Sequence, residues 1–445
     1  MTKAQDFESV YTKRQRIAEL ARKNPQMAFT SLNHYLDIEW LRCAFYDTRK
    51  NGAPGVDGQT WHDYEVNLED NLRSLLERAK SGTYQAPPVR RVHIPKGGST
   101  TETRPIGIPT LEDKVLQRAV VMVLESIYEQ DFYDCSFGFR PGRSAHDALE
   151  TLWQQAMDMG TRCILEVDIR RFFDTLGHGQ LREFLQLRVR DGVLLRLISK
   201  WLHAGVMEEE QISYPEAGSP QGGVISPILA NAYLHYVLDD WFHKEVLPRL
   251  RGPAFLIRYA DDFVMAFTDE HDARRVHEVL PKRMSKYGLA IHPTKTRLVP
   301  FASPQPGNVA RTDRPGTFDF LGFTHFWARS RKGAWVIKRR TASSRLTRAV
   351  QAMATWCRTH RHHPLQEQHQ VLCQKLRGHF QYYGVTGNSP QLKSYRTAVA
   401  QVWYKWLARR KRKPYPSWAW FSRLLERYPL PPARPVHSVC LAAKA

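Results

Sequence analysis

Three aspartates are the residues of this chain best suited to metal-dependent chemistry on phosphate groups. Asp261 and Asp262 are adjacent, and Asp168 lies far upstream of them. Carboxylate oxygens are the hard ligands that Mg²⁺ prefers, and such sites leave room for substrate phosphates. Two such ions can activate a hydroxyl nucleophile and stabilise a leaving pyrophosphate. We therefore predict nucleotide addition with Asp168, Asp261 and Asp262 as catalytic metal ligands, to which Ile169 adds its carbonyl oxygen.

Short apolar runs must position these carboxylates. Residues 254–259 and 263–267 are separated only by a polar break, so they predict a tight hairpin with the aspartates at its tip. Residues 163–169 predict a neighbouring strand that brings Asp168 beside the tip. An Asp-Asp pair is also an ordinary turn dipeptide, and the chain has a second one at 239–240. The flanking strands and Asp168 favour the metal site over an ordinary turn.

Several other motifs follow one another in an order that is typical of one protein family. They contain the sequences Arg-Pro-Ile-Gly, Phe-Gly-Phe-Arg, Pro-Gln-Gly-Gly, Phe-Leu-Gly and Arg-Gly-His-Phe and lie at 104–109, 137–144, 219–227, 318–323 and 376–385. A Gly-rich loop at 51–58 precedes them. With the Tyr-Ala-Asp-Asp hairpin they cover roughly residues 30 to 430 and resemble the group II intron-encoded reverse transcriptases.

The resemblance implies an α+β protein with the right-hand polymerase fold. It places an N-terminal extension and fingers at 1–160, together with part of the palm. A palm with an antiparallel sheet and inserted fingers helices follows at 161–330. A basic α-helical thumb or maturase domain is expected at 331–430, and a tail at 431–445.

The implied activity is that of an RNA-directed DNA polymerase that uses two Mg²⁺ ions, with Mn²⁺ as a substitute. The implied partners are dNTPs, an RNA template/DNA primer duplex, target DNA and the group II intron RNA, whose splicing and mobility the protein would assist. Two alternatives stay open. One is a domesticated relative in phage defence or DNA repair, and the other is a maturase that acts mainly as an RNA-binding splicing factor.

The resemblance also implies a nucleotide pocket. Gln221, in the Pro-Gln-Gly-Gly loop, would contact the incoming nucleotide, and the glycines would let a base pair approach the backbone. An aromatic ring after Asp168 would exclude a 2′-hydroxyl, with Phe173 as the first choice and Phe172 as the second. One of the two rings is expected to be core. Candidate contacts to triphosphate or nucleic-acid backbone are Lys96, Arg104 and Lys295.

Charge is segregated along the chain. The net charge is +21, and residues 331–445 carry all of it, with 23 Lys and Arg against two acids. The first 330 residues hold 42 of each sign. Phosphate is the natural partner of such a polycation. The predicted RNA-binding residues are Arg377, Arg409, Arg410, Lys411, Arg412 and Lys413. Residues 392–413 predict a helix whose aromatic side chains are core rather than a stacking platform.

The remaining sequence is less specific. The six cysteines show no paired spacing, which argues against a zinc site or disulfides and fits a reducing bacterial cytosol or nucleoid. The histidines at 360–369 predict a solvated or RNA-facing loop rather than a metal site. No secretory signal and no membrane span are expected. No HNH endonuclease pattern is found, so we expect priming from a nascent strand or an existing end. The oligomeric state stays open.

Overall fold

The computed structural model describes residues 3–95, 103–208, 211–213, 222–304, 315–410 and 416–437. It divides into two compact units. Unit 1 comprises 1–94, 102–152 and 163–298, and unit 2 comprises 95–101, 153–162 and 299–445. The mixture of helices with mainly antiparallel sheets confirms the predicted α+β class. Within the described ranges, no helix is both long and apolar enough to cross a membrane.

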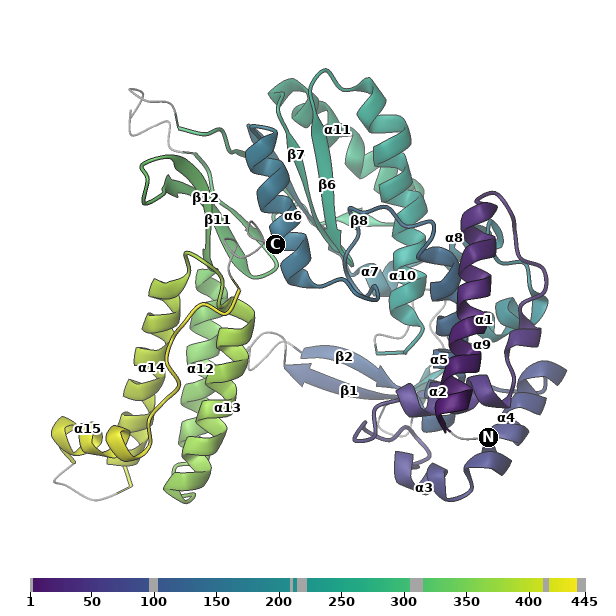
Figure 1. Cartoon of the computed structure of the whole chain (residues 1–445), viewed down its shortest axis with the longest axis horizontal. Helices are drawn as coiled ribbons and strands as arrows, with labels where there is room; N and C mark the ends of the chain where they lie inside the picture. The colour runs from purple at the N-terminus through teal and green to yellow at the C-terminus, as the bar shows by residue number, and fades with distance from the viewer. Residues whose placement is uncertain are drawn as a thin grey trace. The chain divides into compact units, whose positions relative to one another are not determined.

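An antiparallel sheet lies at the centre of unit 1. Its strands follow the order β6-β7-β3-β8, and β9 also pairs with β3. Their bounds are β3 (Cys163–Arg170), β6 (Ala254–Tyr259), β7 (Asp262–Phe267), β8 (Ala290–Ile291) and β9 (Arg297–Pro300). Helix α11 (Glu270–Lys286) packs against β3 and β7 (Figure 1). Strand β7 is buried from Phe263 to Phe267, which explains its uninterrupted apolar sequence.

Helices make up most of the rest of unit 1. Helix α5 (Leu111–Tyr128) is buried along nearly its whole length and packs against α1 (Lys3–Lys23) and α2 (Ile38–Asp47). A small sheet of order β2-β1-β4-β5 adjoins these helices; its strands are β1 (Val89–Pro95), β2 (Thr103–Ile108), β4 (Val206–Glu208) and β5 (Gln211–Ser213). The other helices are α3 (Trp61–Val66), α4 (Leu68–Ser81), α7 (Phe172–Thr175), α8 (His178–Gln186) and α9 (Gly192–Leu202). Helix α6 (Ala145–Asp158) begins in unit 1, and its residues from Trp153 on belong to unit 2.

A change of helical type follows helix α10 (Ser226–Leu234). The chain continues as π-helix over His235–Asp239 and again over Phe242–Val246. A π-turn rotates the following side chains relative to the α-helical register, and such turns are frequent at functional sites. Asp239 is the last residue of the first π-helix, and its side chain is fully buried.

Unit 2 combines a three-stranded sheet with a helical bundle. The sheet has the order β10-β11-β12, with β10 (Phe318–Phe320), β11 (Phe323–Arg329) and β12 (Trp335–Thr341). Trp153 of α6 donates its indole N–H to the Ile337 carbonyl at 2.8 Å. The helices are α12 (Ser343–Thr359), α13 (Leu365–Tyr383), α14 (Ser389–Ala408) and α15 (Trp418–Arg427). The first three run alongside one another around Trp403, which is 0% exposed (Figure 1).

Two predicted boundaries differ from this structure. The boundary expected at 330 lies in the turn between β11 and β12, which are paired strands of one sheet. The expected tail is bound to the bundle at least as far as His437. Arg396 donates to the Pro431 carbonyl at 3.0 Å, and the Val436 N–H donates to the Gly384 carbonyl at 2.7 Å. A Pro-rich sequence gives no sign of these two hydrogen bonds.

The contribution of His325 to the free energy of unfolding is expected to fall as the pH drops from about 7 toward 4. His325 on β11 is fully buried against Phe318, with ring centroids 4.6 Å apart. Burial lowers the pKa of His325 to about 3. The unfolded chain therefore takes up a proton that the folded chain excludes. Stability is complete above the ordinary histidine pKa of about 6.5 and is lost toward the folded pKa, at up to about 1.4 kcal/mol per pH unit.

Urea denaturation at about pH 7.5, 6 and 5 measures this dependence. The His325→Phe variant removes the titrating ring and should flatten the slope. Burial lowers the pKa values of His235 and His379 to about 4, and both histidines are unchanged in this variant. Their contribution to the pH dependence should therefore persist. An identical slope in His325→Phe and the wild type would contradict the assignment.

Candidate catalytic site

The turn between β6 and β7 places two of the three aspartates. Tyr259 and Asp262 face each other across the hairpin, so the turn consists of Ala260 and Asp261 alone. Ala260 has a φ of +57°, a left-handed conformation that is uncommon for a residue with a side chain. Two-residue hairpin turns require positive φ because their twist must match that of the strands. The predicted hairpin is therefore confirmed in position and type.

Strand β3 brings the third aspartate to the same end of the sheet. Asp168 lies directly opposite Asp262 in the antiparallel register of β3 and β7. The Asp168 carbonyl accepts the His292 N–H at 2.8 Å, on the side of β8. Because carbonyls alternate in direction along a strand, we expect the next one, that of Ile169, to face the aspartates of the hairpin.

The side chain of Asp168 has a cationic partner. Lys295 Nζ lies 2.9 Å from Asp168 Oδ2, and both side chains are largely exposed. Backbone contacts hold this lysine in place, because Thr296 donates its N–H to the His292 carbonyl at 3.0 Å. Lys295, predicted as a phosphate contact, therefore lies at the carboxylates themselves.

Negative charge accumulates at the turn. Burial raises the pKa of Asp261, the charge of Asp168 raises it further, and the charge of Arg104 lowers it. A divalent cation would relieve the repulsion between these carboxylates. Among the described residues, no three His, Cys, Asp or Glu side chains form a cluster that could hold a metal ion. The donor set fits a hard cation, provided that Asp168 exchanges its ammonium partner for the ion.

A buried ion pair supports the turn between β6 and β7. Arg258 is fully buried in β6 and reaches Asp239 through two hydrogen bonds of 2.8 and 2.5 Å. The same guanidinium donates to Asn231 Oδ1 at 2.9 Å and to the Ala260 carbonyl at 3.1 Å. Burial opposes the charge on Arg258, yet Asp239 keeps the pKa of Arg258 above its ordinary value. One guanidinium thus fixes the carbonyl of the residue that precedes Asp261.

The Phe-Gly-Phe-Arg motif closes over the same turn. A Cβ on Gly138 would lie 2.3 Å from the Ala260 nitrogen, so only glycine allows this approach. The Gly138 carbonyl accepts the Asn231 side-chain amide at 2.7 Å, and the Phe137 N–H donates to the Arg258 carbonyl at 2.9 Å. The motif is therefore part of the support of the hairpin.

The two candidate gate residues differ in burial. Phe172 is 1% exposed and packs edge-on against Phe173 and Tyr233, so it is a core residue and cannot reach a nucleotide. Phe173 is half-buried. Arg171, in left-handed backbone with a φ of +48°, turns the chain sharply between β3 and α7. Of the two candidates, Phe173 is the one that is partly exposed, and its role as a gate stays a prediction.

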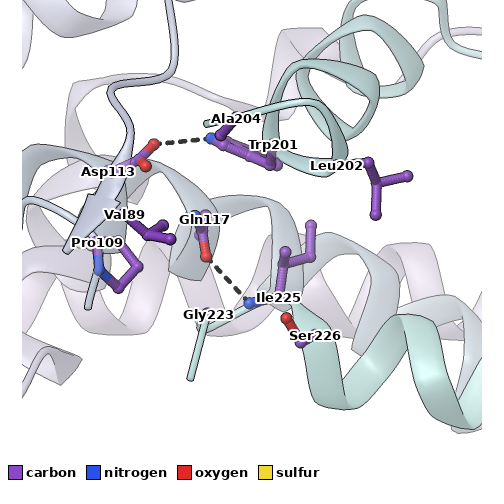
Figure 2. A pocket seen from close by; sticks show the side chains of 10 residues that line it. All are labelled: Val89, Pro109, Asp113, Gln117, Trp201, Leu202, Ala204, Gly223, Ile225 and Ser226. Carbon is purple, nitrogen blue, oxygen red and sulfur yellow. Dashed lines mark hydrogen bonds between the residues drawn. The ribbon is translucent and has the colours of Figure 1, made fainter. Parts of the chain in front are cut away.

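The loop before α10 is anchored at a small cavity. Figure 2 shows Gln117 accepting the Ile225 N–H (3.2 Å) and Trp201 donating to Asp113 (2.8 Å). Burial raises the pKa of Asp113 to about 6. The cavity measures about 10 Å³, comparable with one water molecule.

Close packing explains one glycine of this loop. A Cβ on Gly222 would lie 2.5 Å from the Gly107 carbonyl oxygen, so Gly222 is needed for contact with β2. This packing is a second reason for glycine here, and the approach of a base pair to the loop stays a prediction. Arg104 is exposed on β2. Gln221 and Lys96 lie outside the described residues.

The predicted RNA-binding residues divide into three groups. Arg377 on α13 and Arg409 after α14 are exposed, and Arg409 covers the ring of Trp406 at 5.0 Å. The Arg410 guanidinium instead hydrogen-bonds the carbonyls of Arg361 and His363, so it supports a loop within unit 2. Lys411, Arg412 and Lys413 lie outside the described residues.

The aromatic side chains and the histidines of unit 2 differ in their burial and contacts. Trp403 is core, as expected for the aromatic side chains of residues 392–413. In α15, Phe421 is core too, whereas Trp418 and Trp420 are 49% and 37% exposed. The histidines at 360–369 form no metal cluster within the described part of the chain. His360 stacks on Trp356, and His369 bonds the Pro429 carbonyl.

Sequence reasoning missed Asp239, which it treated as half of an ordinary Asp-Asp turn. The π-helix that orients it leaves no clear periodicity. A signal was nevertheless present in β6, because Arg258 interrupts an apolar strand and a buried arginine requires an anionic partner.

Comparisons with known proteins agree with this geometry. A family model described as reverse transcriptase (RNA-dependent DNA polymerase) matches residues 94–325. The group II intron-encoded protein LtrA of Lactococcus lactis subsp. cremoris is 39% identical over 224 residues, which are 50% of this chain and 37% of that protein. Protein YkfC of Escherichia coli K12 is 37% identical over 258 residues, 51% of this chain and 67% of that protein.

A more distant relative comes from a fission yeast. A 91 kDa protein in the cob intron of Schizosaccharomyces pombe is 30% identical over 283 residues, covering 52% of this chain and 34% of that protein. The chain thus spans little more than a third of the length of LtrA and of the yeast protein.

Replacing Asp239 by Ala should destabilise unit 1 by about 3–5 kcal/mol, because it leaves the Arg258 charge buried without its anion. The matched control is Asp240→Ala. Asp240 is partly exposed and binds Tyr133 and Lys244, so its loss should cost about 1 kcal/mol or less. Urea denaturation compares the two variants, and equal losses would contradict the central role of the buried pair.

Proposed function

Because this chain belongs to the reverse transcriptase family, we propose that it is an RNA-directed DNA polymerase of the group II intron type. It adds deoxynucleotides to a primer 3′-end on an RNA template. The observation that carries the proposal is the cross-strand placement of Asp168 opposite Asp262, with Asp261 in the adjoining turn.

The family depends on divalent metal ions, and here Asp168, Asp261 and Asp262 would hold two Mg²⁺, with Mn²⁺ as a substitute. When bound, the ions activate the primer hydroxyl and stabilise the leaving pyrophosphate. The protein holds the carboxylates on paired strands, where the buried Arg258 fixes the turn. Lys295 stabilises triphosphate oxygens once it leaves Asp168, and Arg104 approaches the same phosphates from β2.

Unit 2 supplies the surface for folded nucleic acid. Its partners are the template–primer duplex, target DNA and the group II intron RNA, which the protein binds to assist splicing and mobility. The support is the charge of residues 331–445, where 23 basic residues face two acids. Exposed Arg377 and Arg409 are candidate contacts to phosphate. RNA helices are read mainly by shape and backbone, which suits a basic helical surface.

Asp261→Ala should abolish primer extension on an RNA template with dNTPs and Mg²⁺, because it removes a carboxylate from the catalytic turn. A loss of at least about 10³-fold in rate is expected. Asp158→Ala, which removes an exposed carboxylate elsewhere, serves as the control and should retain activity. Extension that persists in Asp261→Ala would exclude the proposed site.

Phe173→Ala should weaken discrimination against ribonucleotides. Removing the ring opens space for the 2′-hydroxyl, and the ratio of kcat/KM for dNTP over rNTP should fall by about 10- to 100-fold. Single-nucleotide extension with dATP and ATP gives this ratio. The buried neighbour provides the comparison: Phe172→Leu should lower stability and leave the ratio unchanged. The gate assignment fails if Phe172→Leu changes the ratio and Phe173→Ala does not.

A further inference from the structure

Phe139 differs in burial from the residues on either side of it. Phe137, Gly138 and Arg140 are buried, whereas Phe139 is 58% exposed. Exposing a large aromatic ring between buried residues gains no hydrophobic stabilisation. Its backbone is also unfavourable, because a φ of +58° is left-handed and crowds a residue with a bulky side chain.

The surrounding contacts show what forces this conformation. On one side, Gly138 lies against the hairpin turn and its carbonyl accepts the Asn231 amide. On the other, the Arg140 guanidinium binds Glu129 and donates to the Tyr133 and Ser136 carbonyls at 2.8 Å each. The chain is fixed at both neighbours of Phe139, and glycine would occupy the position between them with less strain.

The ring of Phe139 lies near the strand residue that precedes the catalytic turn. Phe139 and Tyr259 have ring centroids 6.4 Å apart, within the range of aromatic pairs. Tyr259 directly precedes Ala260 and Asp261. An exposed ring beside this hairpin offers a surface to a nucleotide at the catalytic turn, and nucleotides stack well on exposed aromatic side chains.

We propose that Phe139 is a positioning residue that packs against a nucleotide of the template–primer duplex at the catalytic turn. The inference rests on the proposed polymerase function and adds a specific contact to it. Strain kept at a position that glycine would relieve is characteristic of functional sites. A purely structural residue would be expected to lose stability when replaced by glycine. Phe139 should instead lose duplex affinity.

The test uses Phe139→Gly in the full chain. Its thermal unfolding temperature should stay the same or rise, because the left-handed strain is relieved. Its Kd for a fluorescent RNA template/DNA primer duplex, measured by anisotropy, should increase about 5- to 100-fold, the equivalent of losing one base–aromatic contact. Phe139→Tyr should retain wild-type affinity. Val279→Ala, which trims an exposed apolar residue of α11, should change neither quantity.

The outcomes separate the inference from the proposed function. A wild-type chain that extends primers, together with a Phe139→Gly variant whose Kd stays within about twofold, would overturn the role of Phe139 and leave the polymerase assignment intact. A marked fall in the unfolding temperature of Phe139→Gly would assign the ring a structural role instead. A wild-type chain that neither binds the duplex nor extends it would overturn the proposed function itself, and the inference with it.

Discussion

One fully buried ion pair governs the catalytic end of unit 1. Arg258 and Asp239 are both 0% exposed, and each of the three guanidinium nitrogens donates to an oxygen of the surrounding structure. Two desolvated charges rarely add stability compared with apolar residues of similar volume, yet breaking such a pair is costly. In this protein the pair fixes the positions of the groups around it. The pair connects the π-helix after α10, the side chain of Asn231 and the carbonyl of Ala260, and so it fixes where the adjoining carboxylates stand.

Strained backbone conformations occur near the buried ion pair. Among the described residues, four that are not glycine have left-handed backbone, and three of them flank the candidate site: Phe139, Arg171 and Ala260. Each such conformation costs about 1–3 kcal/mol and persists only where neighbouring contacts determine it. For the turn between β6 and β7, Gly138 makes such a contact, because its backbone packs against the Ala260 nitrogen. The buried pair and the strained turns therefore depend on one another.

The sequence predicts features that depend on local pattern. The apolar runs on either side of Asp261 and Asp262 define the hairpin, and the run ending near Asp168 defines its partner strand. Features that depend on distant contacts are not predictable in this way. Asp239 required knowledge of a π-turn, and the burial of Phe172 depended on Tyr233, about sixty residues away in the chain. Arg410 looked like part of a basic cluster, but two carbonyls of a distant loop bind it. Composition can suggest that a surface binds phosphate, yet it cannot say which guanidinium groups already have a partner.

The path of the chain between the two units has a consequence for biosynthesis. Residues 153–162 belong to unit 2, although residues 163–298 of unit 1 follow them and the rest of unit 2 begins only at 299. On the ribosome, Trp153 therefore emerges long before Ile337, the residue whose carbonyl accepts its indole N–H. Until strand β12 has been synthesised, the C-terminal end of α6 lacks the carbonyl group that Trp153 binds in the folded protein. An aromatic side chain left exposed in this way is a natural target for chaperones. For the same reason, a C-terminal fragment that begins at residue 299 would lack residues 153–162, which belong to the same unit.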